Sequence, residues 1–150
     1  MEQKGLRGSS ATRIDEKGRL KVPTIFRGVI QDQHGPDVFV TSVTGESVRI
    51  YPMPVWLEIE RKLTLMPANH PARLKFLDRV NYYGQGSELD GQGRVVIPAQ
   101  LRERAAIVGD VRVFGRIDYL EVWNEERFSE RMEREPWTDD DGLKLAEHGI

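Results

Sequence analysis

One short motif occurs twice in this chain of 150 residues, and its repetition constrains the fold more than any other feature. The pattern Asp-x-x-Gly-Arg starts at Asp15 and again at Asp90. In both places a proline follows the arginine by four residues, and a second arginine follows the proline by four. Weaker similarity continues beyond both motifs while the offset between the copies shrinks from 75 to 73 to 72 residues. Such short deletions belong in loops, so two homologous units are predicted.

Each copy of the motif predicts a tight hairpin that leads into a short helix. The aspartate can accept hydrogen bonds from the backbone amides ahead of it, and the glycine adopts the positive φ of the turn without steric cost. The proline has no amide to donate to a strand, and its φ suits the first turn of a helix. The residues expected to form the turn and the helix start are Asp15, Gly18 and Pro23 in the first copy and Asp90, Gly93 and Pro98 in the second.

The rest of each unit is predicted to be mostly β, because short apolar stretches alternate with polar residues around tight turns. Between the units, helices are expected to begin near Pro54 and Pro71, and Phe128 and Met132 indicate another helix after the second unit. The last dozen residues, rich in acids, are expected to form a mobile tail. One hairpin buries too little apolar surface to be stable alone, so the units should share a core. Strands are expected at 10–14, 19–22, 38–42, 47–51, 111–115 and 119–123.

The composition excludes several kinds of site. The chain has no cysteine, which rules out disulfides, thiolate catalysis and cysteine-ligated metals, and its three histidines lie far apart, so no metal site is predicted. There is no P-loop, no complete dinucleotide-binding glycine motif and no nucleophile with a paired base, so neither an enzyme nor a cofactor is expected. No apolar run could cross a bilayer and no secretory signal is evident, so the expected location is the cytoplasm, without a membrane partner.

The formal net charge of −2 conceals an uneven distribution. Residues 125–150 contain four cations and nine acids, a balance of −5, which leaves +3 for the remaining 124 residues. Residues 11–28, around the first motif, contain five cations and two acids, which accounts for the same +3. The basic charge is therefore concentrated at the first hairpin, where a polyanion could bind.

The duplicated motif, with its proline-started helix and the arginine within that helix, resembles the AbrB/SpoVT family of swapped-hairpin DNA-binding domains. The resemblance extends from about Ser9 to Phe128, and the tandem arrangement makes it more specific than a single motif. It implies an α+β fold, mostly β, in which two tandem AbrB/SpoVT-like units form a pseudo-dimeric double-psi-type β-barrel with flanking helices. The expected division is unit 1 at 9–53, a helical connector at 54–84, unit 2 at 85–128, and a helix end with the acidic tail at 129–150.

Resemblance to the family members that carry two motif copies also implies a function. Those members are transcriptional regulators that bind double-stranded DNA at promoter repeats of the bacterial cell-division and cell-wall gene cluster, generally as repressors, and that assemble into ring-like homo-oligomers. The same resemblance implies a cytoplasmic, nucleoid-associated protein. The alternative is an antitoxin-like or scaffold module of the same fold, although toxin-binding members usually carry one motif copy.

Two interpretations remain open for the motif cations. Spacing favours a structural pair between each motif arginine and its aspartate, whereas the resemblance places Arg19 and Arg94 at the DNA surface. Lys17 and Lys21 are solvated cations by default, but beside Arg19 they form a stripe suited to phosphate contacts. The arginines expected within the two short helices, Arg27 and Arg102, suit a structural role and a DNA contact equally. The full set of expected DNA-binding residues is Arg13, Lys17, Arg19, Lys21, Arg27, Gln92, Arg94 and Arg102.

The two copies differ at this surface. Lys17 of the first copy corresponds to Gln92 of the second, and Lys21 corresponds to Val96. We therefore expect the first copy to provide most of the phosphate affinity, while Arg94 and Gln92 make weaker or more base-directed contacts. So few cations per subunit would bind one DNA site weakly, which makes assembly into a ring the expected source of affinity.

Overall fold

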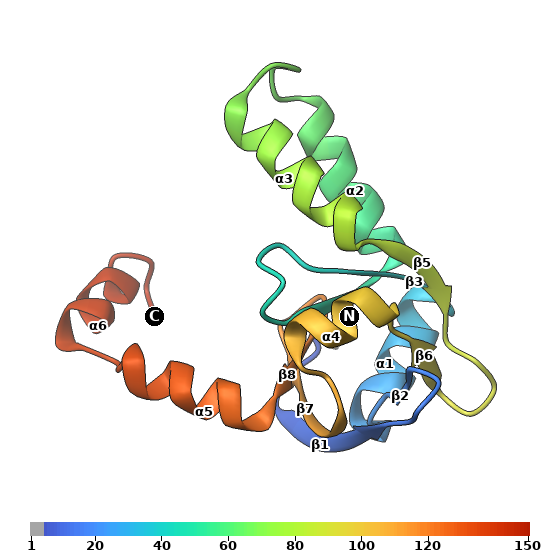
Figure 1. The fold of residues 1–150 in the computed structure, drawn as a ribbon. Coiled ribbons are helices and arrows are strands. Elements are labelled where there is room, and N and C mark those ends of the chain that lie inside the picture. The colour runs from blue at the N-terminus through green and yellow to red at the C-terminus, as the bar shows by residue number, and fades with distance from the viewer. Residues whose placement is uncertain (1–4) are drawn as a thin grey trace.

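Within residues 5–150, eight strands form a single antiparallel sheet that curls into a nearly closed barrel, with helices flanking it (Figure 1). The structure, a computed structural model, describes residues 5–150. The strands are β1 (Ser9–Ile14), β2 (Arg19–Lys21), β3 (Asp37–Thr41), β4 (Val48–Pro52), β5 (Gln85–Glu88), β6 (Arg94–Val96), β7 (Gly109–Gly115) and β8 (Leu120–Asn124). The helices within the described residues are α1 (Thr24–His34), α2 (Met53–Thr64), α3 (Pro71–Tyr83), α4 (Ala99–Ala105), α5 (Glu125–Arg134) and α6 (Asp139–Ala146).

Strands of the two sequence repeats interleave in this sheet. Strand β1 pairs with β7 and β2 pairs with β6, while β3 pairs with β5 and β4 pairs with β8, so every strand of one repeat has a neighbour from the other. Each repeat alone would keep only the pairings within itself, β1 with β2 and β3 with β4 in the first and β7 with β8 in the second. The predicted α+β class, with a strand-built barrel and flanking helices, is confirmed. The unit boundaries proposed from the sequence stay a prediction.

Equivalent residues of the two repeats face each other at two places in the sheet. Leu20 of β2 lies opposite Val95 of β6, and both side chains are fully buried in the main core. Arg49 of β4 lies opposite Glu121 of β8. This is the arrangement of a pseudo-twofold axis. In a dimer of one repeat, identical charges would oppose each other at the second place, whereas the duplicated chain places opposite charges there.

Glu121 is buried, and both of its carboxylate oxygens accept hydrogen bonds. The hydroxyl of Ser47 donates to Oε2 at 2.5 Å, and Nε of Arg116 donates to Oε1 at 2.9 Å. Burial alone would raise the pKa of Glu121, but these two hydrogen bonds and the nearby charge of Arg49 outweigh it, so the pKa lies below its usual value. The carboxylate therefore stays ionised at neutral pH and stabilises the junction of β4 and β8.

Helices α2 and α3 form a hairpin that projects from one side of the barrel (Figure 1). Both helices begin beside prolines, as the sequence predicts, and the side chain of His70 caps α3 by accepting from the amide of Ala72 at 3.1 Å. A second apolar cluster joins the hairpin to the sheet, where Trp56 stacks on Phe39 with ring centroids 4.7 Å apart. No helix within residues 5–150 combines the length and apolar character needed to cross a membrane.

The C-terminal residues contain a helix where the sequence analysis expected only a mobile acidic tail. Helix α6 starts at a capping box, in which Thr138 accepts from the amide of Asp141 and the Asp141 carboxylate accepts from the amide of Thr138. The run from Asp139 to Asp141 lies in the first turn, where negative charge interacts favourably with the helix dipole. Helix α6 was therefore not expected from the sequence, because acids that indicate a solvated tail can also start a helix.

Candidate nucleic-acid interface

The two motif turns have nearly the same internal geometry. Oδ1 of Asp15 accepts from the amides of Lys17 and Arg19 at 3.0 and 2.9 Å, and Oδ2 accepts from Nε of Arg19 at 2.6 Å. In the second turn, Asp90 accepts from the amides of Gln92 and Arg94 and from Nε of Arg94, each at 2.9 Å. The backbone hydrogen bond from the motif arginine is the main cause that lowers the pKa of each aspartate. Both turns are therefore held by an ionised carboxylate.

The motif arginines are paired with aspartate but remain partly exposed. The Arg19 side chain is 34% exposed and the Arg94 side chain 27% exposed. Each pair uses Nε, and no hydrogen bond within residues 5–150 uses the Nη atoms of either arginine. The structural pairing that the spacing favours thus exists, and it leaves the outer edge of each guanidinium open for a further contact.

Strands β2 and β6 bring the two motifs together in one surface. Arg19 lies opposite Val96 and Lys21 lies opposite Arg94 in the antiparallel register. The residues between them, Leu20 and Val95, point into the core, so these four side chains lie on the outer side of the pair. We call this surface, made of Arg19, Lys21, Arg94 and Val96, the ribbon face.

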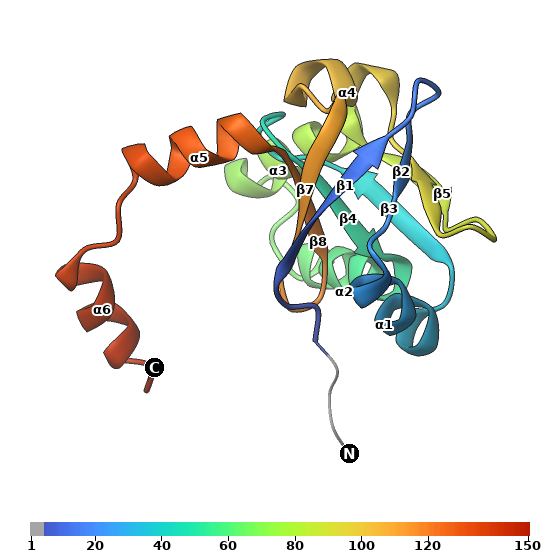
Figure 2. The same cartoon turned by 90° about the horizontal axis from the view of Figure 1, so that it is seen from below.

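Lys17 and Gln92 occupy the tips of the two turns at opposite ends of the ribbon face. Both are exposed, and both turns project beyond the strands of the barrel (Figure 2). Arg13 lies on β1 and forms an ion pair with Asp110 of β7 at 3.3 Å, with both side chains more than three-quarters exposed. Such an exposed pair contributes little to stability and leaves Arg13 accessible.

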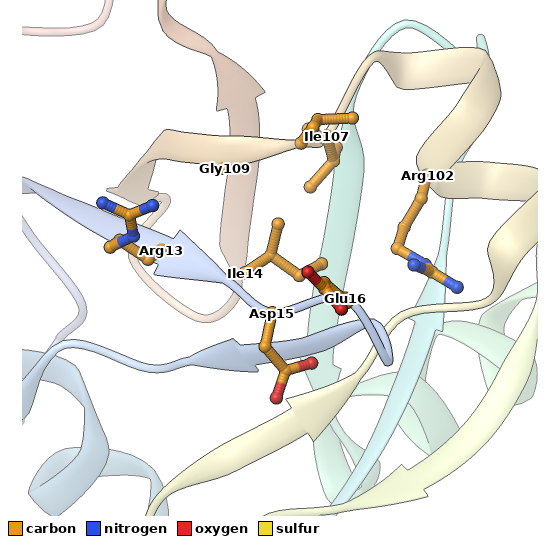
Figure 3. A pocket seen from close by; sticks show the side chains of 8 residues that line it. Arg13, Ile14, Asp15, Glu16, Arg102, Ile107 and Gly109 are labelled. Atoms are coloured by element: carbon orange, nitrogen blue, oxygen red, sulfur yellow. The ribbon is translucent and has the colours of Figure 1, made fainter.

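A hollow of about 690 Å³ opens beside the first turn, next to the segment that connects α4 to β7. Arg13 and Arg102 lie on opposite sides of it, with Ile14, Asp15 and Glu16 between them (Figure 3). A phosphate entering this hollow would meet two carboxylates as well as two guanidinium groups. The ribbon face, whose charged outer positions are all cationic, is therefore the better anion surface.

Arg27 and Arg102 each reach across to the turn of the other repeat. Nη1 of Arg27 donates to the carbonyl of Gln92 at 2.9 Å, and the Arg27 side chain lies against Gly93. Nε of Arg102 donates to the carbonyl of Ile97 at 3.0 Å, and its guanidinium lies against Gly18 in the first turn. Both arginines are half-buried. This placement gives each of them a clear structural role, namely to brace the opposite turn.

The second repeat lacks cations at three positions where the first has them. Besides the two differences expected from the sequence, Arg13 of the first repeat corresponds to Glu88 of the second. In the first repeat, Arg13 of β1 lies opposite Asp110 of β7, a cation opposite an acid. At the equivalent place in the second repeat, Glu88 of β5 lies opposite Asp37 of β3, so two acids face each other. Glu88 and Val96 were not among the residues expected at this surface, although the offset of 75 residues places Glu88 at the Arg13 position.

Known proteins match this chain along most of its length. A transcriptional regulator MraZ from Acidobacterium capsulatum is 51% identical over 144 residues, which cover 96% of this chain and 99% of the relative. The MraZ regulators of Koribacter versatilis and Tolumonas auensis are 48% and 31% identical, over 96% and 93% of this chain and 99% and 97% of their own lengths. The model of the MraZ protein family, described as antitoxin-like, matches residues 85–141. The duplicated motif, the interleaved barrel and these relatives together show that the chain belongs to the MraZ family.

Proposed function

We propose that this protein is a sequence-specific DNA-binding transcriptional regulator that contacts promoter repeats through the ribbon face and the two adjoining turns. Its family is one of transcriptional regulators and not of enzymes. The observation that carries the proposal is the ribbon face itself, where Arg19, Lys21 and Arg94 lie together on two neighbouring strands. A two-stranded ribbon fits the major groove of B-DNA, which a pair of short antiparallel strands can therefore read.

The aspartates prepare the two motif arginines for this contact. Asp15 holds Arg19 through Nε, and Asp90 holds Arg94 in the same way. A guanidinium that is already oriented loses less side-chain entropy on binding, and its Nη edge can donate to guanine O6 and N7 or to a phosphate. In this proposal the aspartates do not contact DNA, because phosphates would repel them.

The two repeats then contribute unequally to binding. The first repeat brings Arg13, Lys17 and Lys21 to the DNA, where the second brings Glu88, Gln92 and Val96. Cations near phosphates provide affinity without sequence preference, whereas an amide or an aliphatic side chain contacts base edges, including the methyl group of thymine. The first repeat accordingly supplies most of the phosphate affinity, and the second supplies contacts that are weaker and more base-directed.

Assembly supplies the affinity that one subunit lacks. A chain with a net charge of −2 and this small cationic surface would hold a single DNA site weakly. Subunits joined in a ring would present several ribbon faces to tandem repeats, so that later contacts form at high effective concentration. The family resemblance supports a ring-like homo-oligomer, a nucleoid location, and repression of the cell-division and cell-wall gene cluster as the regulatory outcome.

The first test is a fluorescence anisotropy titration of the wild-type protein against a promoter fragment with tandem repeats, beside a shuffled fragment of the same composition. We expect binding to the repeats to be at least about 1,000-fold tighter than to the shuffled fragment. Affinity should fall steeply between about 50 and 200 mM salt, because phosphate contacts release counterions. Absence of binding at low salt would contradict DNA binding and favour the protein-interaction alternative, whereas equal binding to both fragments would contradict sequence specificity.

Exchanging Lys21 and Val96 tests the inequality of the repeats. Lys21→Val should weaken binding to both fragments by about three- to tenfold and reduce the salt dependence by about one counterion per subunit, because a phosphate contact is lost. Val96→Lys should strengthen binding to the shuffled fragment and so narrow the preference for repeats. The two side chains occupy symmetry-equivalent positions, which makes each variant the control for the other. An unchanged salt slope in Lys21→Val would remove Lys21 from the interface.

A further inference from the structure

The C-terminal arm, defined here as residues 132–150, extends away from the barrel in both views (Figures 1 and 2). The first half of α5 packs on the sheet, where Phe128 stacks on Phe114 with ring centroids 4.2 Å apart. Beyond that contact the large apolar side chains are open to solvent. The most exposed in the arm are Met132 at 62%, Trp137 at 70%, Leu143 at 68% and Ile150 at 81%.

An arm of this kind is better stabilised against another surface than in water. Helix α6 has only eight residues, and isolated helices of that length are marginal. Trp137 alone offers a large apolar area, and its ring lies next to Gly142 of α6, so that side chain and helix form one small unit. The first turn of α6 adds three consecutive acids, at Asp139, Asp140 and Asp141. The arm therefore suits a partner surface that is apolar in the centre and positively charged around it.

The chain itself contains such a surface. A groove of about 610 Å³ lies between the loop that joins β3 to β4 and helix α3. Val43, Ala72 and Phe76 supply its apolar lining, and Lys75 and Arg79 supply its charge. Both cations are exposed, and neither forms an ion pair with any residue between 5 and 150.

A second, smaller hollow also has Phe76 in its lining. It has a volume of about 200 Å³, and Leu63 and Met66 line it together with Phe76 and the cation Lys62. The α2–α3 hairpin and the adjoining loop thus present two apolar hollows that share Phe76, an apolar strip accompanied by three cations. We call the two hollows together the hairpin groove.

We propose that the C-terminal arm of one subunit docks into the hairpin groove of a second copy of this chain. Trp137 and Leu143 occupy the apolar strip around Phe76, and the acids of α6 lie near Lys75 and Arg79. The two surfaces differ, so the contact is head-to-tail, and repetition of such a contact closes into a ring when the rotation between subunits permits. The inference rests on the oligomeric regulator proposed above and names its subunit contact. The ribbon face, on β2 and β6, takes no part in this contact and stays free for DNA.

Charge reversal on exposed residues tests the contact without disturbing a core. Asp139→Lys with Asp140→Lys reverses the arm, and Lys75→Glu with Arg79→Glu reverses the groove. By sedimentation velocity over a range of concentrations, each reversed protein should dissociate at a concentration at least tenfold higher than the wild type. A chain with both reversals should regain assembly. Equal assembly of all four proteins would overturn the proposal.

Mixing two defective proteins shows whether the contact is head-to-tail. A subunit with Trp137→Ala keeps its groove, and a subunit with Lys75→Glu and Arg79→Glu keeps its arm, so their mixture should form one-to-one dimers and nothing larger. Ile25→Ala is the matched control, because Ile25 is 58% exposed on α1, outside both surfaces, and its removal should leave assembly unchanged. Loss of assembly in this control, or rings in the mixture, would contradict the proposal.

Cysteine pairing separates docking on a neighbour from folding back on the same chain. The natural chain has no cysteine, so Leu143→Cys with Ala72→Cys introduces the only two thiols. Oxidation should give a ladder of linked subunits on a denaturing gel. Linked monomers would instead show the arm in its own groove and overturn the proposal. If the proteins assemble normally but do not bind DNA, the proposed function is wrong and the subunit contact stands. If the wild type is monomeric and binds single repeats, the subunit contact is wrong and DNA binding stands.

Discussion

Replacing Arg19 and Arg94 together by alanine should weaken binding to the tandem-repeat fragment by at least about 30-fold, because each bidentate arginine contact with guanine contributes roughly 1–3 kcal/mol. The loss should be larger for an assembled ring than for one subunit, since every ribbon face loses both contacts. The two single variants should each show a smaller part of the effect. Anisotropy titration at one fixed salt concentration measures all three proteins against the wild type.

The structure also indicates why these variants should stay folded. Asp15 and Asp90 each keep two hydrogen bonds from backbone amides when the arginine side chain is removed. The arginine side chains are partly exposed, so their loss leaves no cavity in the core. Circular dichroism and thermal unfolding check that the variants remain native. A folded double variant that binds as tightly as the wild type would show that the ribbon face is not the interface.

Two controls separate charge from geometry in this experiment. Arg61→Ala removes another carboxylate-paired arginine, from α2, where Arg61 donates to both carboxylate oxygens of Glu58, and it should leave DNA binding unchanged. Arg19→Lys keeps the charge but loses the planar pair of donors. It should therefore retain binding to the shuffled fragment while its preference for the repeats falls. Equal losses for both fragments would assign Arg19 to phosphate and not to a base.

Local rules were enough to predict the turns from the sequence. Gly18 and Gly93 have φ values of +84° and +74°, and helices follow Pro23 and Pro98, as the motif requires. The pairing of strands across the repeats could not be derived in that way. Arg27 donates to the carbonyl of Gln92, 65 residues later in the chain, and no local preference encodes a contact of that range. Only the resemblance to swapped-hairpin proteins supplied this part of the fold.

The misread C-terminal segment shows a different limit. Thr138 and Asp141 have the spacing of a capping box, which was visible in the sequence. The acids of this segment indicated a solvated tail instead, and α6 has no buried residue that would mark it as part of a core. Exposed apolar residues such as Trp137 gain a role only when a second copy of the chain is considered. Patterns within one chain reveal such surfaces poorly.

Gly93→Ala should destabilise the barrel by about 2–3 kcal/mol, because it combines a left-handed backbone with the loss of a bracing contact. The residue has a φ of +74°, which a side chain makes costly. A Cβ atom at this position would also overlap Nη1 and Cδ of the Arg27 side chain. Arg27 would have to move, and its hydrogen bond to the carbonyl of Gln92 would be lost. Urea unfolding at one fixed protein concentration measures the change, since assembly also contributes to stability.

Gly91→Ala is the matched control within the same turn. No heavy atom lies within 4 Å of a Cβ built on Gly91, and its φ lies outside the left-handed region, so the change should stay within about 0.5 kcal/mol. Arg27→Ala should remove the steric part of the defect, so adding Gly93→Ala to Arg27→Ala should cost less than adding it to the wild type. If the Gly93 variant were as stable as the Gly91 variant, the contact of Arg27 with the second turn would not require glycine. Arg27 and Arg102 would then lose the structural role of bracing the opposite turns.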